Sequence, residues 1–165
     1  MREERTIRRH RVKLILFGLF LFAVMALIFY MSAQNATDSS SMSRSLYSSW
    51  IGQILDRILP KLLSQNGENS LRKYAHLFEF FLLGLSCFLF VYELFWVKES
   101  RLKKTVAVSF LGSVLYSCSD EWHQMYVPGR SGQFRDVCLD SLGIAAGIIL
   151  MSLVVFVVHV RHKHA

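Results

Sequence analysis

Long apolar runs alternate with short charged segments along this chain. Residues 14–31 carry no charged side chain, and residues 136–160 form a second long run that is interrupted only by Asp136, Asp140 and His159. About 20 apolar residues are needed to cross a bilayer as a helix. Residues 74–97 pass on length, and residues 105–126 reach it if the helix continues through the polar segment near its end. The pattern predicts an all-α, polytopic membrane protein with four transmembrane helices.

A fifth helix is predicted between the first two spans. Apolar pairs recur every four residues from 46–47 to 62–63, which places one apolar stripe along a helix at about 44–63. Trp50 suits the headgroup layer, and Pro60 should kink or end the helix. We expect an interfacial amphipathic helix on the outer leaflet, or alternatively one packed on the outer end of the bundle.

Composition and charge agree with a membrane protein and set its orientation. The chain is 53% hydrophobic with a mean hydropathy of +0.34, which is too apolar for an ordinary soluble domain. The net charge of +7 is concentrated in segments 1–13, 98–104 and 161–163. This distribution is typical of topology signals and argues against nucleic-acid binding. We therefore predict a basic cytoplasmic segment 1–13, a membrane domain at 14–160 and both termini in the cytoplasm.

Ionisable side chains gather in the outer half of three predicted spans. Such residues are costly in lipid and usually face the interior of a bundle. On the fourth span they share a face with Gly143 and Gly147, whose spacing permits close helix contact. We expect an outward-opening polar pocket formed by His76, Glu79, Asp120, Glu121, His123, Gln124, Asp136 and Asp140, with Arg130 and Arg135 above it.

Two chemistries fit this set of side chains. The first candidates, for divalent-metal ligands or for general acid and base groups, are His76, Glu79, Asp120 and His123. The second set could hold a ligand, with the two guanidinium groups binding a phosphate or carboxylate: Glu121, Gln124, Arg130, Arg135, Asp136 and Asp140. The alternative is a satisfied polar core, in which arginines pair with the acids and His76 pairs with Glu79 without binding anything.

The polar segments resemble the VanZ-like family. The resemblance is carried by residues 72–80, 119–132 and 136–143 and by Ser32-Ala33-Gln34, and it runs from about residue 14 to 155. It implies a small multi-pass protein of the bacterial cytoplasmic membrane, in a family named for a member associated with low-level teicoplanin resistance. Phe80 and Asp140 depart from the pattern, which has Tyr and Asn at these positions.

Two functions follow as hypotheses. In the first, a protein of the cell envelope recognises an anionic envelope component in its outer pocket and affects glycopeptide (teicoplanin) susceptibility. In the second, a metal-assisted membrane hydrolase or transferase acts on a lipid-linked substrate. A channel is less well supported, because the polar stripe ends halfway across the membrane unless Glu93 continues it.

Overall fold

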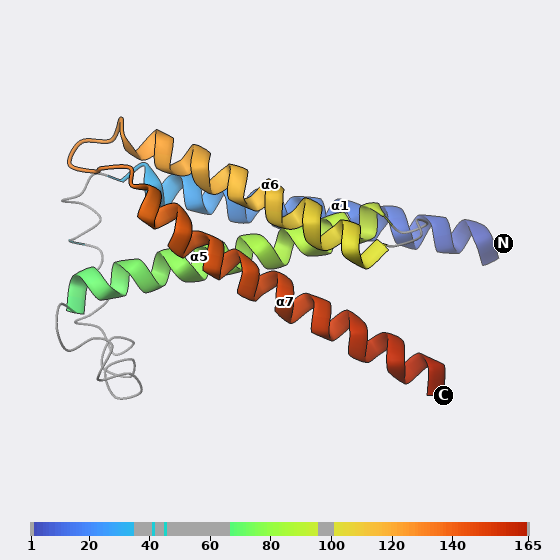
Figure 1. Ribbon diagram of the computed structural model, residues 1–165. Coiled ribbons are helices and arrows are strands. Elements are labelled where there is room, and N and C mark those ends of the chain that lie inside the picture. The colour runs from blue at the N-terminus through green and yellow to red at the C-terminus, as the bar shows by residue number, and fades with distance from the viewer. Residues whose placement is uncertain (1, 35–40, 42–44, 46–66, 96–100, 165) are drawn as a thin grey trace.

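The computed structural model describes residues 2–34, 41, 45, 67–95 and 101–164. Within these residues the main elements are four helices, whose arrangement is seen in Figure 1. These are α1 (Arg2–Ser32), α5 (Gly67–Leu94), α6 (Arg101–Gln124) and α7 (Phe134–His164). No strand occurs among these residues, so the all-α prediction is confirmed. Apart from Ser45, the predicted interfacial helix at about 44–63 lies outside the described residues and stays a prediction.

Three of the helices are long and apolar enough to cross a membrane. They contain the segments Glu3–Ser32, Lys73–Leu94 and Phe134–Arg161, and they correspond to three of the four predicted spans. The α6 helix has 24 residues and therefore a length of about 36 Å, which suffices for crossing. It is not among the three apolar segments, because its composition is too polar. The assignment of α6 as a fourth span stays a prediction.

Apart from the exposed Lys103, Lys104 and Ser119 near its two ends, the polar residues of α6 lie mainly on the face that packs inside the bundle. Its buried residues are all polar: Thr105, Ser109, Ser113, Ser117, Asp120, Glu121 and Gln124. Its exposed large residues include Val108, Phe110, Leu111 and Leu115, which are apolar. A helix with this pattern presents its apolar side outward, as expected where lipid rather than water surrounds the protein.

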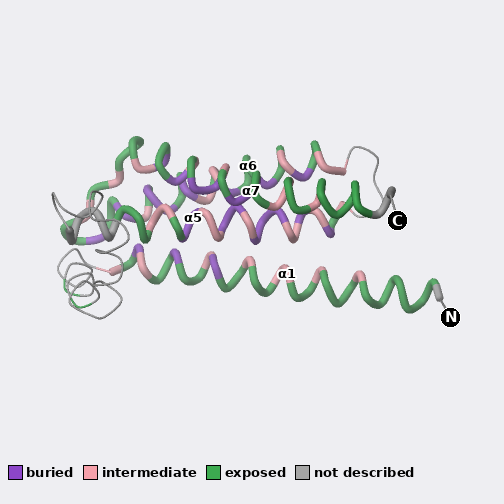
Figure 2. The backbone as a smooth tube through the Cα atoms, turned by 90° about the horizontal axis from the view of Figure 1, so that it is seen from below, coloured by how far each residue is buried: buried purple, intermediate pink, exposed green. Residues whose placement is uncertain are grey.

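The α5 helix is the centre of the bundle, because it contacts α1, α6 and α7. Phe80, Leu83 and Phe88 on α5 are fully buried and form a core with Ile28 of α1 and Ile144 of α7. In Figure 2, the buried positions of α1 lie on the side that faces the other helices, and its N-terminal half is mostly exposed and contains no buried residue among those described. The core is thus built mainly around α5.

Glycines bring α5 and α7 into backbone contact. A Cβ added at Gly143 would meet the carbonyl of Leu77, and one added at Gly147 would meet the carbonyl of Phe81. The predicted packing face of the fourth span is therefore confirmed, with α5 as its partner. This close approach fixes where α7 side chains lie relative to those of α5.

The bundle has two opposite ends, at which the helices begin and end (Figure 1). At the loop end, residues 125–133 connect α6 to α7 beside the C-terminus of α1 and the N-terminus of α5. At the terminal end, α1 begins and α7 ends. We use these two names below.

Glu93 belongs to the terminal end and not to the polar residues of the loop end. It is hydrogen-bonded to His10 at 2.8 Å and ion-paired with Arg101 at 3.6 Å. The Arg101 guanidinium also lies over the ring of Tyr92, 3.5 Å from its centroid. These contacts join α1, α5 and α6, so Glu93 has a structural explanation.

Candidate functional site

A cavity of about 150 Å³ opens at the loop end. One ordered water needs about 10–15 Å³, so the cavity has room for several waters or a small polar group. Its walls come from α5, α6, α7 and the turn between α6 and α7. The lining residues are Lys73, His76, Leu77, Glu121, Gln124, Gly129, Arg130, Ser131, Gln133, Asp136, Leu139 and Asp140.

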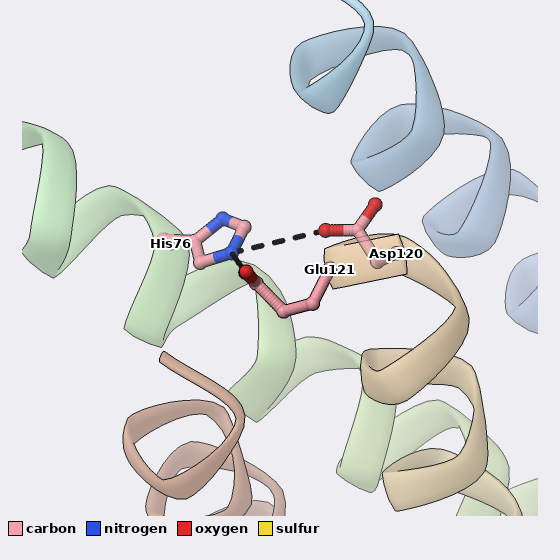
Figure 3. A group of neighbouring side chains, drawn as sticks. All are labelled: His76, Asp120 and Glu121. Carbon is pink, nitrogen blue, oxygen red and sulfur yellow. Dashed lines mark ion pairs between the residues drawn. The ribbon is translucent and has the colours of Figure 1, made fainter. Parts of the chain in front are cut away.

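Four carboxylates converge on one imidazole beside this cavity. Nε2 of His76 lies 3.6 Å from Oδ1 of Asp140 and 3.9 Å from both Oδ2 of Asp120 and Oε1 of Glu121. Its Nδ1 lies 3.4 Å from Oε2 of Glu79. Figure 3 shows the side chains of His76, Asp120 and Glu121 pointing toward one another from α5 and α6. These five residues are called the His76 cluster below.

Helical spacing explains how the cluster forms. His76 and Glu79 are three residues apart on α5, so they share a face one turn apart. Asp120 and Glu121 are both buried near the end of α6, and both have a carboxylate oxygen 3.9 Å from His76 Nε2. Asp140 lies on the second turn of α7, where Gly143 holds that helix against α5.

Hydrogen bonds from outside the cluster orient three of its carboxylates. Oδ2 of Asp120 accepts from Ser32 Oγ at 2.9 Å, and Oδ2 of Asp140 accepts from Ser117 Oγ at 2.7 Å. Oε2 of Glu121 accepts from the backbone N–H of Gln133 at 2.9 Å. For Glu121 and Asp140 the anchored oxygen is not the one that faces His76. The free oxygen of each is thereby directed at the imidazole.

Two further predicted residues line the cavity without joining the cluster. Gln124 is buried and donates from Nε2 to Oδ2 of Asp120 at 2.8 Å, so it supports the cluster from α6. Asp136 is half-buried in the first turn of α7, where a negative charge interacts favourably with the helix N-terminus. Both residues therefore lie at the cavity, and their assignment as ligand-binding residues stays a prediction.

The two predicted arginines occupy different places. Arg130 lines the cavity, but its Nε donates to the carbonyl of Gln34 and its Nη2 to that of Met31, each at 3.2 Å. These bonds tie the turn to the C-terminus of α1. Arg135 is exposed and does not line the cavity. Only Arg130 is in a position to meet a ligand there.

His123 also lies apart from the cluster. Its ring packs against Phe29 of α1 with a centroid distance of 4.7 Å. Its Nδ1 is buried with no hydrogen-bond partner among the described residues. Among the described residues, the ligand atoms of His76, Asp120 and Glu121 lie close enough together to hold a metal ion, and His123 is not in this group. The assignment of His76, Glu79, Asp120 and His123 as metal or acid-base groups stays a prediction.

The sequence analysis did not predict two residues of the site. Lys73 lines the cavity, and Ser117 supports Asp140. A signal for Ser117 was present, because Thr105, Ser109, Ser113 and Ser117 follow a four-residue spacing that leads to Glu121. No comparable pattern identifies Lys73, because in the sequence it resembles the other basic residues at the ends of the spans.

Comparison with known proteins gives one result. A family model described as VanZ/LLP1 matches residues 17–156, a range that contains every residue of the His76 cluster. No curated protein and no solved structure matches the chain.

Proposed function

The chain belongs to the VanZ/LLP1 family, and from this premise we propose that its loop-end cavity recognises an anionic component of the bacterial cell envelope. Binding of that component would affect susceptibility to glycopeptide antibiotics such as teicoplanin. The observation that carries the proposal is the cavity itself, because Lys73 and Arg130 line it together and could bind an anionic group.

The orientation in the membrane is part of the proposal. Basic residues such as Arg8, Arg9, Lys104 and Arg161 are exposed near the terminal end, and the positive-inside rule assigns such an end to the cytoplasm. With α6 as a fourth span, the loop end then faces the outside of the bacterial cytoplasmic membrane. An envelope component would reach the cavity from that side or from the outer leaflet.

Exposed apolar side chains support the membrane setting. Large residues that face outward include Leu19, Phe22, Leu142, Ile149 and Phe156. Apolar surfaces of this extent are rare in soluble monomers and are expected where lipid is the solvent. The lipid bilayer is thus the first partner that the proposal requires.

A susceptibility assay tests this proposal. We expect that expression of the protein in a glycopeptide-sensitive bacterium raises the minimal inhibitory concentration of teicoplanin, and that Lys73→Gln returns it to the host's own value. The matched control is Lys103→Gln, which removes an exposed lysine near the terminal end and should keep full protection. Immunoblots of isolated membranes would establish equal amounts of each variant. No protection by the wild type, or full protection by Lys73→Gln, would contradict the proposal.

A further inference from the structure

We propose that the His76 cluster binds a divalent cation of the first transition row, such as Zn²⁺ or Mn²⁺. The ligand atoms are Nε2 of His76, Oδ2 of Asp120, Oε1 of Glu121 and Oδ1 of Asp140. A mixed set of imidazole and carboxylate ligands suits these ions better than Mg²⁺ or Ca²⁺, which prefer oxygen alone. Metal binding itself does not depend on the proposed function, and only the role of the cation toward an envelope component rests on it.

The distances in the cluster favour an ion over direct hydrogen bonds. The separations of 3.6 and 3.9 Å between His76 Nε2 and the three oxygens are too long for hydrogen bonds. Ligand atoms that surround a tetrahedral metal at 2.0–2.2 Å lie about 3.3–3.6 Å from one another. Ligand atoms of His76, Asp120 and Glu121 all lie within 4.8 Å of one another. Small side-chain rotations would therefore bring them onto one ion.

The negative charge of the cluster favours the binding of a cation. The side chains of Asp120 and Asp140 are each 1% exposed, and that of Glu121 is 7% exposed. In the described part of the chain, the ion pairs of these acids all go to His76. Buried carboxylates are costly unless they are paired or coordinate a metal. One imidazole cannot balance several carboxylates, whereas a divalent cation adds two positive charges.

An unpartnered atom at the same place supports an additional occupant. Oδ1 of Asp120 is buried and has no hydrogen-bond partner among the described residues. Buried polar atoms in native proteins nearly always have a partner, which can be a water or an ion. Figure 3 shows that Oδ2 of Asp120 is the oxygen nearer His76, so a water or an ion beside the carboxylate would supply the missing partner of Oδ1.

The surroundings of the cluster fit a metal site in two other ways. The hydrogen bonds from Ser32, Ser117 and the Gln133 backbone hold the carboxylates in place, which is the usual role of groups behind metal ligands. His76 and Asp140 also line the cavity, so an ion can enter from the loop end. Under the proposed function, the cation would offset the negative charge of Glu121 and Asp140, which line the cavity. An anionic group could then bind beside it.

Metal content of the purified protein tests the inference. The full chain would be purified in detergent with a non-histidine affinity tag, stripped with a chelator, equilibrated with Zn²⁺ or Mn²⁺, and analysed by elemental mass spectrometry. We expect one ion per chain in the wild type and a loss of bound metal in His76→Gln and Glu121→Gln. The matched control His159→Gln changes an exposed histidine of α7 and should keep the ion. A wild type without stoichiometric metal, or equal metal in all variants, would overturn the site.

A second measurement does not depend on how the variants fold. X-ray absorption at the zinc edge of the wild type should show nitrogen and oxygen neighbours with one imidazole. Sulfur neighbours would overturn the assignment, because they would place the ion on the cysteines. The two proposals also fail separately. Bound metal together with full protection by Lys73→Gln would refute the proposed function alone, and absent metal together with loss of protection would refute the metal site alone.

Discussion

Replacement of Gly147 by alanine tests the contact that sets α7 against α5. The added Cβ would meet the carbonyl of Phe81 and lie 2.9 Å from the backbone nitrogen of Leu85. Both obstacles are backbone atoms, so neither can rotate away, and α7 must shift. Overpacking of this kind costs about 1–3 kcal/mol. Because Asp140 lies on the same helix, a shift would also change its distance from His76.

Gly112 provides the matched control on α6. A Cβ at this position meets nothing within 4 Å, so Gly112→Ala should be neutral or stabilising by up to about 1 kcal/mol through helix propensity. The same propensity gain applies to Gly147→Ala, so the difference between the two variants isolates the steric cost. Unfolding in mixed micelles with increasing dodecyl sulfate, followed by circular dichroism, would measure both free energies. Equal free energies of unfolding would refute the close approach of α5 and α7.

Substitutions at three further positions test contacts between the other elements. Arg130→Ala removes the hydrogen bonds to the carbonyls of Gln34 and Met31. Hydrogen bonds from charged groups are worth about 1.5–3 kcal/mol, so this variant should lower the free energy of unfolding by about 2 kcal/mol. Arg130→Lys should recover part of this loss in the same micelle assay. Tyr116→Phe removes a 2.7 Å hydrogen bond to the Met25 carbonyl and should cost about 1 kcal/mol, so an unchanged stability would argue against that bond. Glu93→Gln removes the buried carboxylate that pairs with Arg101 and should destabilise the protein by about 1–3 kcal/mol. A stabilised variant would contradict the ion pair.

The fold was largely predictable from the sequence, because three helices contain an apolar segment long enough to cross a membrane. The α6 helix was harder to assign. All of its buried residues are polar and its large apolar residues face outward, which lowers the mean hydropathy of the segment without preventing contact with lipid. A search for buried hydroxyl residues at four-residue spacing would have identified its inner face.

The candidate site was predictable in its depth but not in its side-chain directions. The sequence predicted that His76, Asp120 and Asp140 lie at a similar depth along their helices, and the structure places these side chains together. Helix-face reasoning grouped His123 with Asp120, yet His123 packs on Phe29 while the adjacent Glu121 faces His76. Consecutive residues differ by about 100° around a helix, so two neighbours can both face a partner that lies between them. The rotation of α6 depends on how α1 and α5 pack on it, which one sequence does not reveal.

The proposed function requires a cavity that opens on the outer face of the membrane, and thiol labelling of intact cells tests this orientation most directly. Ser131 lines the cavity and is exposed, whereas Lys104 is exposed near the terminal end. In a background with Cys87, Cys118 and Cys138 changed to alanine, each position would be replaced by cysteine. A membrane-impermeant maleimide should label Ser131→Cys in intact cells and Lys104→Cys only after permeabilisation. Labelling of Lys104→Cys in intact cells, with Ser131→Cys protected until permeabilisation, would contradict the account.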